Sequence, residues 1–219
     1  ARLVASYDDG DWVALVLDDV EGRRPPVPWT TPDIDAVTRS LSRVAATAGH
    51  PELPPFADVV LALSAWDDVA ANPDGLDPGL TARLPEMLDH QARAREVTRG
   101  DALVHWDARS DNILIRPDGE AVLLDWAWAC RGVTWLDTLL LAVDFVVQGG
   151  PDPDDFLRSA GATRDVPGVH LQSVVACMVG VWSDRARRPA PPGLPTIRAW
   201  QGHCARGALR WLDEGTVWD

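Results

Sequence analysis

The fold of this chain is decided by residues 103–115, which read LVHWDARSDNILI, and by residues 121–126, which read AVLLDW. His105, Asp107 and Asn112 follow one another as H-x-D-x-x-x-x-N, and the apolar residues around them predict two buried strands. The second strand ends in an aspartate of its own. A loop of this kind feeding a hairpin that ends in an acid is typical of a phosphoryl-transfer site. One carboxylate can receive a hydroxyl proton, and two more oxygen-bearing side chains can hold Mg²⁺.

The turn between the two strands sets how their ends face each other. Residues 117–119 read Pro-Asp-Gly, in which proline presets φ and glycine accepts a positive φ. With the turn centred after Asp118, Asn112 lies opposite Asp125, and directly opposed Cβ atoms are about 5 Å apart. That spacing suits two ligands of one Mg²⁺, whereas Asp107 precedes the hairpin and is placed to face a substrate. Each residue alone could be a turn or core residue, and the ordered set favours the functional interpretation.

The segment resembles the aminoglycoside phosphotransferase and choline kinase branch of the protein-kinase-like fold. Members carry a histidine, a catalytic aspartate, an asparagine and then a hydrophobic strand that ends in Asp-Trp, Asp-Phe or Asp-Tyr. The matching residues here are His105, Asp107, Asn112 and Asp125-Trp126. The resemblance implies that Asp107 is the catalytic base, that Asn112 and Asp125 are magnesium ligands, and that ATP or GTP is the co-substrate.

Three more residues can be compared with the same pattern. Asp137 matches an aspartate that starts a helix and braces the catalytic loop in the family, and a first-turn acid stabilised by the helix dipole is a compatible alternative. Trp106 stands where members usually have glycine, and it either shapes the acceptor pocket or packs in the core. Arg109 occupies the place of a lysine in protein kinases. It is a catalytic candidate that would stabilise charge on the transferred phosphoryl group, with a solvated surface arginine as the alternative.

The first residues resemble the end of a kinase small lobe. Residues 2–7 and 12–17 predict two strands joined by a turn, and residues 15–22 resemble the last small-lobe strand and the hinge to the large lobe. In the family the hinge backbone binds adenine, which by matching position implies the Asp18 carbonyl and the Val20 amide.

Two parts of a kinase nucleotide site are missing from the sequence. All 20 basic residues are arginine, so no lysine can hold the phosphates, and no glycine-rich phosphate loop is visible. We expect a missing N-terminal small lobe, upstream of Ala1 in the same full-length chain, to carry both. The competing explanation is a degenerate kinase that never had them.

The rest of the sequence predicts helices separated by proline-rich segments. The predicted helices cover residues 31–49, 80–97, 135–147, 170–182 and 196–212, with a short one opening at 151–155 and an apolar candidate at 59–66. The predicted fold class is α+β and protein-kinase-like, with a mostly α-helical large lobe, a catalytic β-hairpin and a two-strand remnant of the small lobe. Residues 1–24 would be the last small-lobe strands and hinge, and residues 25–219 the catalytic and acceptor-binding lobe.

Composition limits the partners. The net charge of −13 repels nucleic acid and anionic membrane surfaces, and there is no run of 18 apolar residues that could span a membrane. The acidity either favours a cationic small molecule or only aids solubility. Three widely spaced cysteines, Cys130, Cys177 and Cys204, match neither a disulfide framework nor a zinc site, so a reducing cytoplasm is the expected compartment.

Tryptophan is unusually frequent, with 11 in the chain. In the family the acceptor commonly docks against the late helices, and indole faces attract cations. Most of the tryptophans must nevertheless be core residues. Six of them follow the metal aspartate or lie on the late helices, and the sequence assigns none of these as a ligand: Trp126, Trp128, Trp135, Trp182, Trp200 and Trp211.

Taken together, the sequence predicts a phosphotransferase that moves the γ-phosphoryl group of ATP or GTP to a hydroxyl of a small molecule. A cationic, amine-bearing acceptor such as an aminoglycoside is one candidate. We expect the 219 residues to be inactive on their own. The alternative is a non-catalytic binding or regulatory protein on the same fold.

Overall fold

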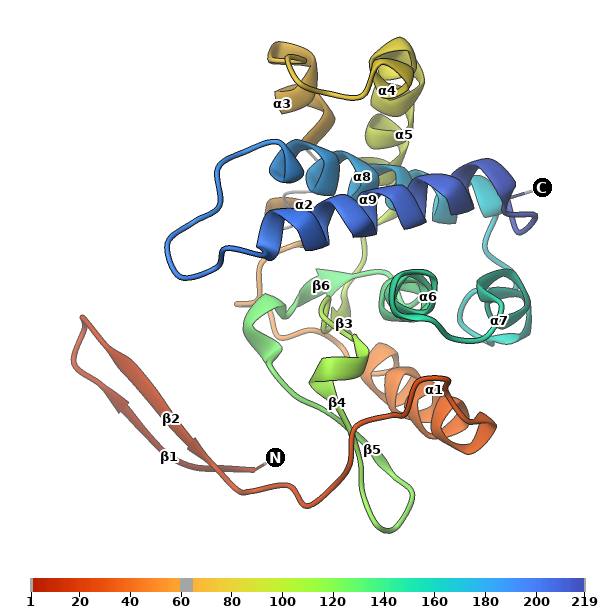
Figure 1. Ribbon diagram of the computed structural model, residues 1–219. Helices are drawn as coiled ribbons and strands as arrows, with labels where there is room; N and C mark the ends of the chain where they lie inside the picture. The colour runs from red at the N-terminus through yellow and green to blue at the C-terminus, as the bar shows by residue number, and fades with distance from the viewer. Residues whose placement is uncertain (1, 60–64, 219) are drawn as a thin grey trace.

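The computed structural model describes residues 2–59 and 65–218. Figure 1 shows a helical body with a separate β-hairpin at its N-terminal end. The elements are β1 (Leu3–Asp8), β2 (Val13–Leu17), α1 (Thr31–Ala45), α2 (Phe56–Val59), α3 (Ala65–Ala71), α4 (Pro78–Ala82), α5 (Leu84–Val97), β3 (Ala102–Val104), η2 (Ser110–Asn112), β4 (Ile113–Ile115), β5 (Ala121–Leu123), η3 (Trp126–Trp128), β6 (Cys130–Gly132), α6 (Leu136–Gln148), α7 (Pro153–Ser159), α8 (Gly168–Ala186) and α9 (Ile197–Glu214).

The predicted helices are found, with two differences. The helix predicted over residues 80–97 is split into α4 and α5, because Pro85 lacks a backbone N–H and the chain starts a new helix at Leu84. Most of the candidate helix at 59–66 lies outside the described residues. None of the described helices is both long and apolar enough to cross a membrane.

The body is built around α6 and α8, which are the most apolar helices. Leu136, Leu139 and Leu141 on α6 have no exposed surface, and α8 contributes buried residues from Leu171 to Gly180. Helices α5 and α9 pack against α8, while α1 packs on β5 at the opposite side of the body (Figure 1). A helix that is apolar on all sides must be buried, so α6 forms a fixed support at the centre of the molecule.

The β1–β2 hairpin lies apart from this core. Its strands pair antiparallel, with Ser6 opposite Leu15, and every described residue of both strands is exposed. In Figure 1 the hairpin extends away from the helices. A two-stranded sheet without a packed face is marginally stable in water, so its apolar side chains have no folded-state support from the described residues.

The β4–β5 hairpin forms as predicted, but its register differs from the expectation by one residue. Ile113 faces Leu123, so that Asn112 is opposite Leu124 and not Asp125. The reason is the turn, in which Arg116 and Glu120 pair and Gly119 takes a φ of 81°. Three residues, 117–119, therefore lie between the paired residues Arg116 and Glu120. The prediction from the sequence had instead placed the centre of the turn between Asp118 and Gly119.

Candidate active site

His105 ties the catalytic loop to the end of β5. Its side chain is buried, and its Nδ1 accepts the backbone N–H of Asp107 at 3.1 Å. The proton must then be on Nε2, which donates to the Leu124 carbonyl at 2.9 Å. Burial lowers the pKa of His105, so the ring stays neutral at pH 7 and keeps this pattern of donor and acceptor. The histidine is thus a structural link and not a proton carrier.

Asp137, at the first turn of α6, holds the other side of the loop. Its carboxylate accepts the backbone N–H of His105 at 2.9 Å and that of Trp106 at 2.8 Å. Burial raises the pKa of Asp137 to about 6. The bracing role expected of this residue is confirmed, and it is at the same time an acid at a helix N-terminus.

The backbone at Trp106 adopts a conformation that suits glycine. Its φ is 55°, in the left-handed region that costs a residue with a side chain about 1 to 2 kcal/mol. The indole packs edge-on against Phe56 with ring centroids 4.6 Å apart, and it also borders the cavity beside Asp107. Both interpretations of Trp106, packing and pocket wall, therefore hold.

Asp107 is held between Asn112 and Arg109. The Nδ2 group of Asn112 donates to its carboxylate at 2.6 Å and to its backbone carbonyl at 3.1 Å. The Nε of Arg109 lies 2.9 Å from the other carboxylate oxygen as an ion pair, without the alignment of a hydrogen bond. Arg109 is also paired with Asp111 at 3.3 Å, and its guanidinium lies over the ring of Trp200 at 5.7 Å. It is not a solvated surface arginine.

The two predicted metal ligands carry free oxygens. Asn112 uses its Nδ2 for Asp107, which leaves Oδ1 as an acceptor, and the carboxylate of Asp125 is exposed and has no hydrogen bond within residues 2–59 and 65–218. Asp125 has a left-handed φ of 60°, which turns its side chain at the strand exit. Asp107 and Asp125 both raise the pKa of His105, so both carboxylates lie near its ring.

This set of donors fits a hard cation. Mg²⁺ prefers oxygen ligands and usually takes one or two from the protein, with water and phosphate completing its shell. The described residues contain no cluster of three acidic, histidine or cysteine side chains that could hold a metal by themselves. The assignment of Asn112 and Asp125 as ligands stays a prediction.

The residues expected at the hinge line a cavity of about 600 Å³. Asp18 and Val20 border it together with Val122 of β5. Neither the Asp18 carbonyl nor the Val20 amide is used in a backbone hydrogen bond within the described part of the chain. The hinge is fixed to β4 by reciprocal bonds between Arg23 and Ile115, of 2.9 and 2.7 Å. The role of Asp18 and Val20 in nucleotide binding also stays a prediction.

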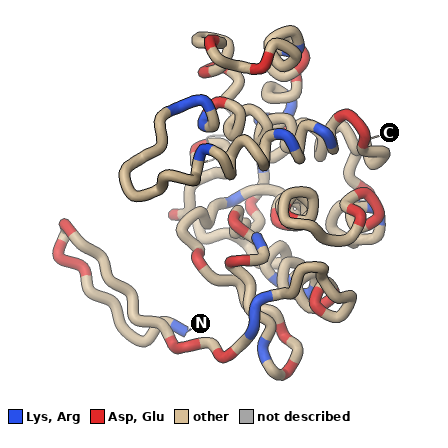
Figure 2. Tube along the Cα trace, in the orientation of Figure 1, with Lys and Arg blue, Asp and Glu red and all other residues tan. Residues whose placement is uncertain are grey.

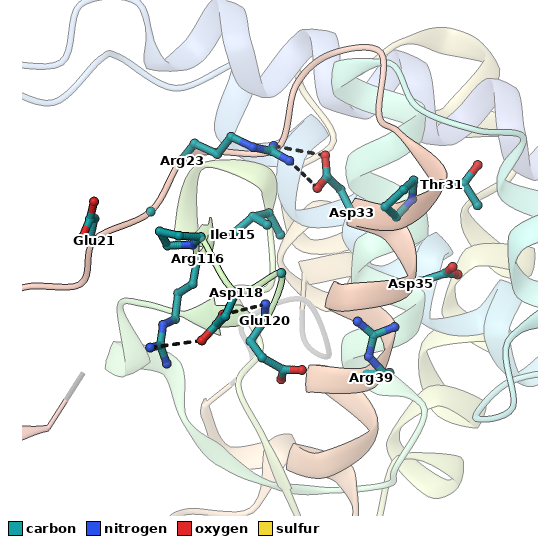
Figure 3. Close-up of a pocket in the computed structure, with 14 residues that line it drawn as sticks. Glu21, Arg23, Thr31, Asp33, Asp35, Arg39, Ile115, Arg116, Asp118 and Glu120 are labelled. Atoms are coloured by element: carbon teal, nitrogen blue, oxygen red, sulfur yellow. Dashed lines mark hydrogen bonds and ion pairs between the residues drawn. The ribbon is translucent and has the colours of Figure 1, made fainter.

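A larger cavity, of about 820 Å³, lies between α1 and the β4–β5 turn and is shown in Figure 3. Four of its eight charged lining residues pair with each other. Arg23 binds Asp33 through two hydrogen bonds of 2.7 and 3.1 Å, and Arg116 pairs with Asp118. It contains no residue of the catalytic loop, so its size does not make it the reaction site.

A smaller cavity, of about 400 Å³, borders Asp107 directly. Its walls come from the catalytic loop, η3, α6, α8 and α9. The tryptophans that line it are Trp106, Trp128, Trp182 and Trp200. Trp211 is instead buried, where its indole N–H donates to Asp154. The structure therefore places three of the six tryptophans noted in the sequence at the cavity, together with Trp106, for which the sequence left this role open.

Sequence reasoning missed two polar residues of this region. Asp144 is buried on α6 and accepts the backbone N–H of Ser110 at 3.0 Å, so it supports the loop beyond Asp107. A lone acid inside an otherwise apolar helix is the signal that could have identified it. Arg185 of α8 lines the cavity beside Asp107, and nothing in its local sequence distinguishes it from its neighbours.

Comparisons with known proteins agree on the fold. No protein-family model and no curated protein matches the sequence. Among solved structures, the chain is similar to an aminoglycoside phosphotransferase from Alicyclobacillus acidocaldarius, with a TM-score of 0.59, 16% identity, and coverage of 97% of this chain and 75% of that one. It is also similar to choline kinase from Streptococcus pneumoniae, with a TM-score of 0.53, 12% identity, and coverage of 83% of this chain and 63% of that one. A third similar structure is an ADP-bound aminoglycoside phosphotransferase, with a TM-score of 0.50, 13% identity, and coverage of 94% of this chain and 75% of that one.

The chain thus has the protein-kinase-like fold of small-molecule phosphotransferases. This result confirms the predicted α+β fold class and the resemblance on which it was based. Identities of 12 to 16% carry the fold only, and they do not transfer the activity of those enzymes.

The raised pKa of Asp137 makes a prediction about stability. The folded protein holds this proton up to about pH 6, whereas the unfolded chain releases it near 3.8. Stability from the protonated group is therefore present below pH 3.8 and is lost as the pH rises to 6. Relative to Asp137→Asn, the free energy of unfolding of the wild type should fall by about 3 kcal/mol over this range. Urea unfolding at several pH values measures it.

The control is Asp155→Asn, which changes an exposed first-turn acid of α7. Its unfolding free energy should follow the wild-type pH curve. Parallel curves for Asp137→Asn and the wild type would contradict the proposed environment of the carboxylate.

Proposed function

We propose that this protein is a phosphotransferase that moves the γ-phosphoryl group of ATP or GTP to a hydroxyl of a small molecule. One observation carries the proposal. The carboxylate of Asp107 is fixed by Asn112 and Arg109, and it borders a cavity of about 400 Å³, a size that suits a small ligand. A hydroxyl bound in that cavity would meet the one carboxylate that the loop presents to it.

In this proposal Asp107 orients the acceptor hydroxyl and receives its proton. Arg109 keeps the carboxylate in position and places positive charge where the transferred group acquires negative charge. Asn112 and Asp125 would hold Mg²⁺, which neutralises the nucleotide phosphates when bound. The hinge atoms of Asp18 and Val20 would bind the base.

Nucleotide binding has support from outside the chain, because one of the enzymes with this fold was solved with ADP. The two hinge groups assigned to the base, the Asp18 carbonyl and the Val20 amide, are backbone groups, and the proposal covers both ATP and GTP. The alternative function, a non-catalytic binding or regulatory protein, is favoured by one observation, which is the absence of lysine from the sequence.

The role of Asp107 can be tested in the full-length gene product that contains these residues. Asp107→Asn should lower kcat by about 10²- to 10⁴-fold with little change in nucleotide affinity, because the base acts in the transition state and does not contact the nucleotide. Steady-state kinetics and nucleotide titration measure the two effects. Asp165→Asn, an exposed acid far along the chain, is the control and should keep normal turnover. Near-normal turnover in Asp107→Asn would remove the assigned role.

The metal ligands make a second prediction. Asp125→Ala should weaken Mg-ATP binding by about tenfold or more, and by more than Asn112→Ala, because it removes a formal charge from the site. Calorimetric titration with Mg-ATP measures both variants. Without metal, with a chelator present, the two variants should bind ATP equally. Unaltered Mg-ATP binding in both would show that the hairpin is structural only.

We also propose that the 219 residues transfer no phosphate on their own, since they contain no lysine and no glycine-rich loop to hold the phosphates. ATP consumption should be measured for this polypeptide and for the full gene product with the same panel of hydroxyl acceptors. Turnover by the 219 residues alone would refute this proposal. Lack of turnover by the full product would favour the non-catalytic alternative.

A further inference from the structure

From the charges of the cavity beside Asp107 we infer that the acceptor has a flat apolar body and an anionic group that binds Arg185, and is not a polycation. The inference builds on the proposed function, since it takes this cavity as the acceptor site. It differs from the cationic acceptor that the overall acidity of the sequence suggested.

Three of the described residues that line the cavity are ionisable: Asp107, Arg109 and Arg185. Asp107 and Arg109 are 2.9 Å apart and offset each other. Residues 60–64, outside the described part, contain no ionisable side chain and leave this balance unchanged. The ionisable side chains that line the cavity therefore sum to one positive charge, although Arg109 has a second partner in Asp111, which is not a lining residue, and the chain as a whole has a charge of −13.

Arg185 supplies that positive charge. Its guanidinium has no hydrogen bond or ion pair within residues 2–59 and 65–218, even though an acid is its direct neighbour. That acid, Asp184, is buried and already pairs with both Arg187, at 2.7 Å, and Arg188. Figure 2 shows this cluster of arginines at the C-terminal end of α8. A partly buried guanidinium facing a small-ligand cavity is a ready partner for a carboxylate or a similar anion.

The ring of Trp200 is not a free cation site. Arg109 already lies over the ring of Trp200 at 5.7 Å, and the edge of Trp182 meets Trp200 with centroids 6.5 Å apart. An ammonium group approaching Trp200 would meet the guanidinium of Arg109, and the two like charges would repel each other. The remaining walls, among them Leu140, Met178 and Val181, suit an apolar or aromatic body.

A charge series of similar ligands tests the inference. The probes are 4-(hydroxymethyl)benzoate, its neutral amide and 4-(hydroxymethyl)benzylamine, with kanamycin as a polycation. Binding is measured by calorimetry without nucleotide. We expect the benzoate to bind about 10- to 100-fold more tightly than the amide, as a charge-assisted contact to an arginine implies, and the benzylamine and kanamycin to bind most weakly.

Two arginine variants test whether Arg185 is the side chain that binds the benzoate. Arg185→Gln should bring benzoate affinity down to that of the amide, whose own affinity should not change. Arg188→Gln is the matched control, because Arg188 lies three residues further along the chain, just after α8, does not line the cavity and is engaged by Asp184. It should leave the order of the three ligands unchanged.

The inference is overturned if the benzylamine or kanamycin binds more tightly than the benzoate, if none of the probes binds, or if both arginine variants change benzoate binding equally. The proposed phosphoryl transfer is tested separately by turnover and Asp107→Asn. The ligand series needs no nucleotide, so either proposal can fail without the other.

Discussion

The buried carboxylate of Asp137 is the contact on which the rest of the site depends. It accepts two consecutive backbone N–H groups, those of His105 and Trp106, and it stands on α6, the most completely buried helix. An unpaired backbone N–H in this position would cost free energy comparable to a lost hydrogen bond, so the loop has one stable path across α6. That path carries Asp107 to the mouth of the cavity. Helix α6 thereby fixes the candidate site through Asp137, and Asp144 of the same helix supports the loop beyond Asp107.

The sequence predicted those elements of the site that have a signal in their own local residues. The order of His105, Asp107 and Asn112 indicated the loop, the alternation around it indicated the strands, and the apolar run of α6 indicated a buried helix. The register of the hairpin was wrong by one residue because proline and glycine identify a turn but do not fix how many residues it leaves unpaired. The observed φ of Gly119 places the extra residue in the turn. The metal and hinge assignments stay predictions, since no ligand tests them.

The lining of the cavity beside Asp107 could not have been read from the sequence. Net charge is a sum over the whole surface, whereas the cavity is lined by a few residues that are far apart in the chain. Helical spacing from Asp184 favours pairing with Arg187 and Arg188, at i+3 and i+4, and leaves Arg185 without that partner. The sequence does not show, however, that Arg185 lines this cavity. Overall composition suggested a cationic acceptor, and local geometry favours an anionic one.

Backbone strain among the described residues is concentrated around His105. Trp106 and Asp125 are the two described residues other than glycine with a positive φ. Each of them directly follows a partner in the hydrogen bond between His105 and Leu124. Trp106 follows His105 and is held by Asp137, while Asp125 follows Leu124, whose carbonyl accepts the histidine proton. A residue stays in such a conformation only where the surrounding contacts fix it more firmly than the strain opposes it. The contacts of His105 and Asp137 therefore do more than locate Asp107: they hold Trp106, which borders the cavity, and Asp125, whose side chain is exposed, in left-handed backbone conformations.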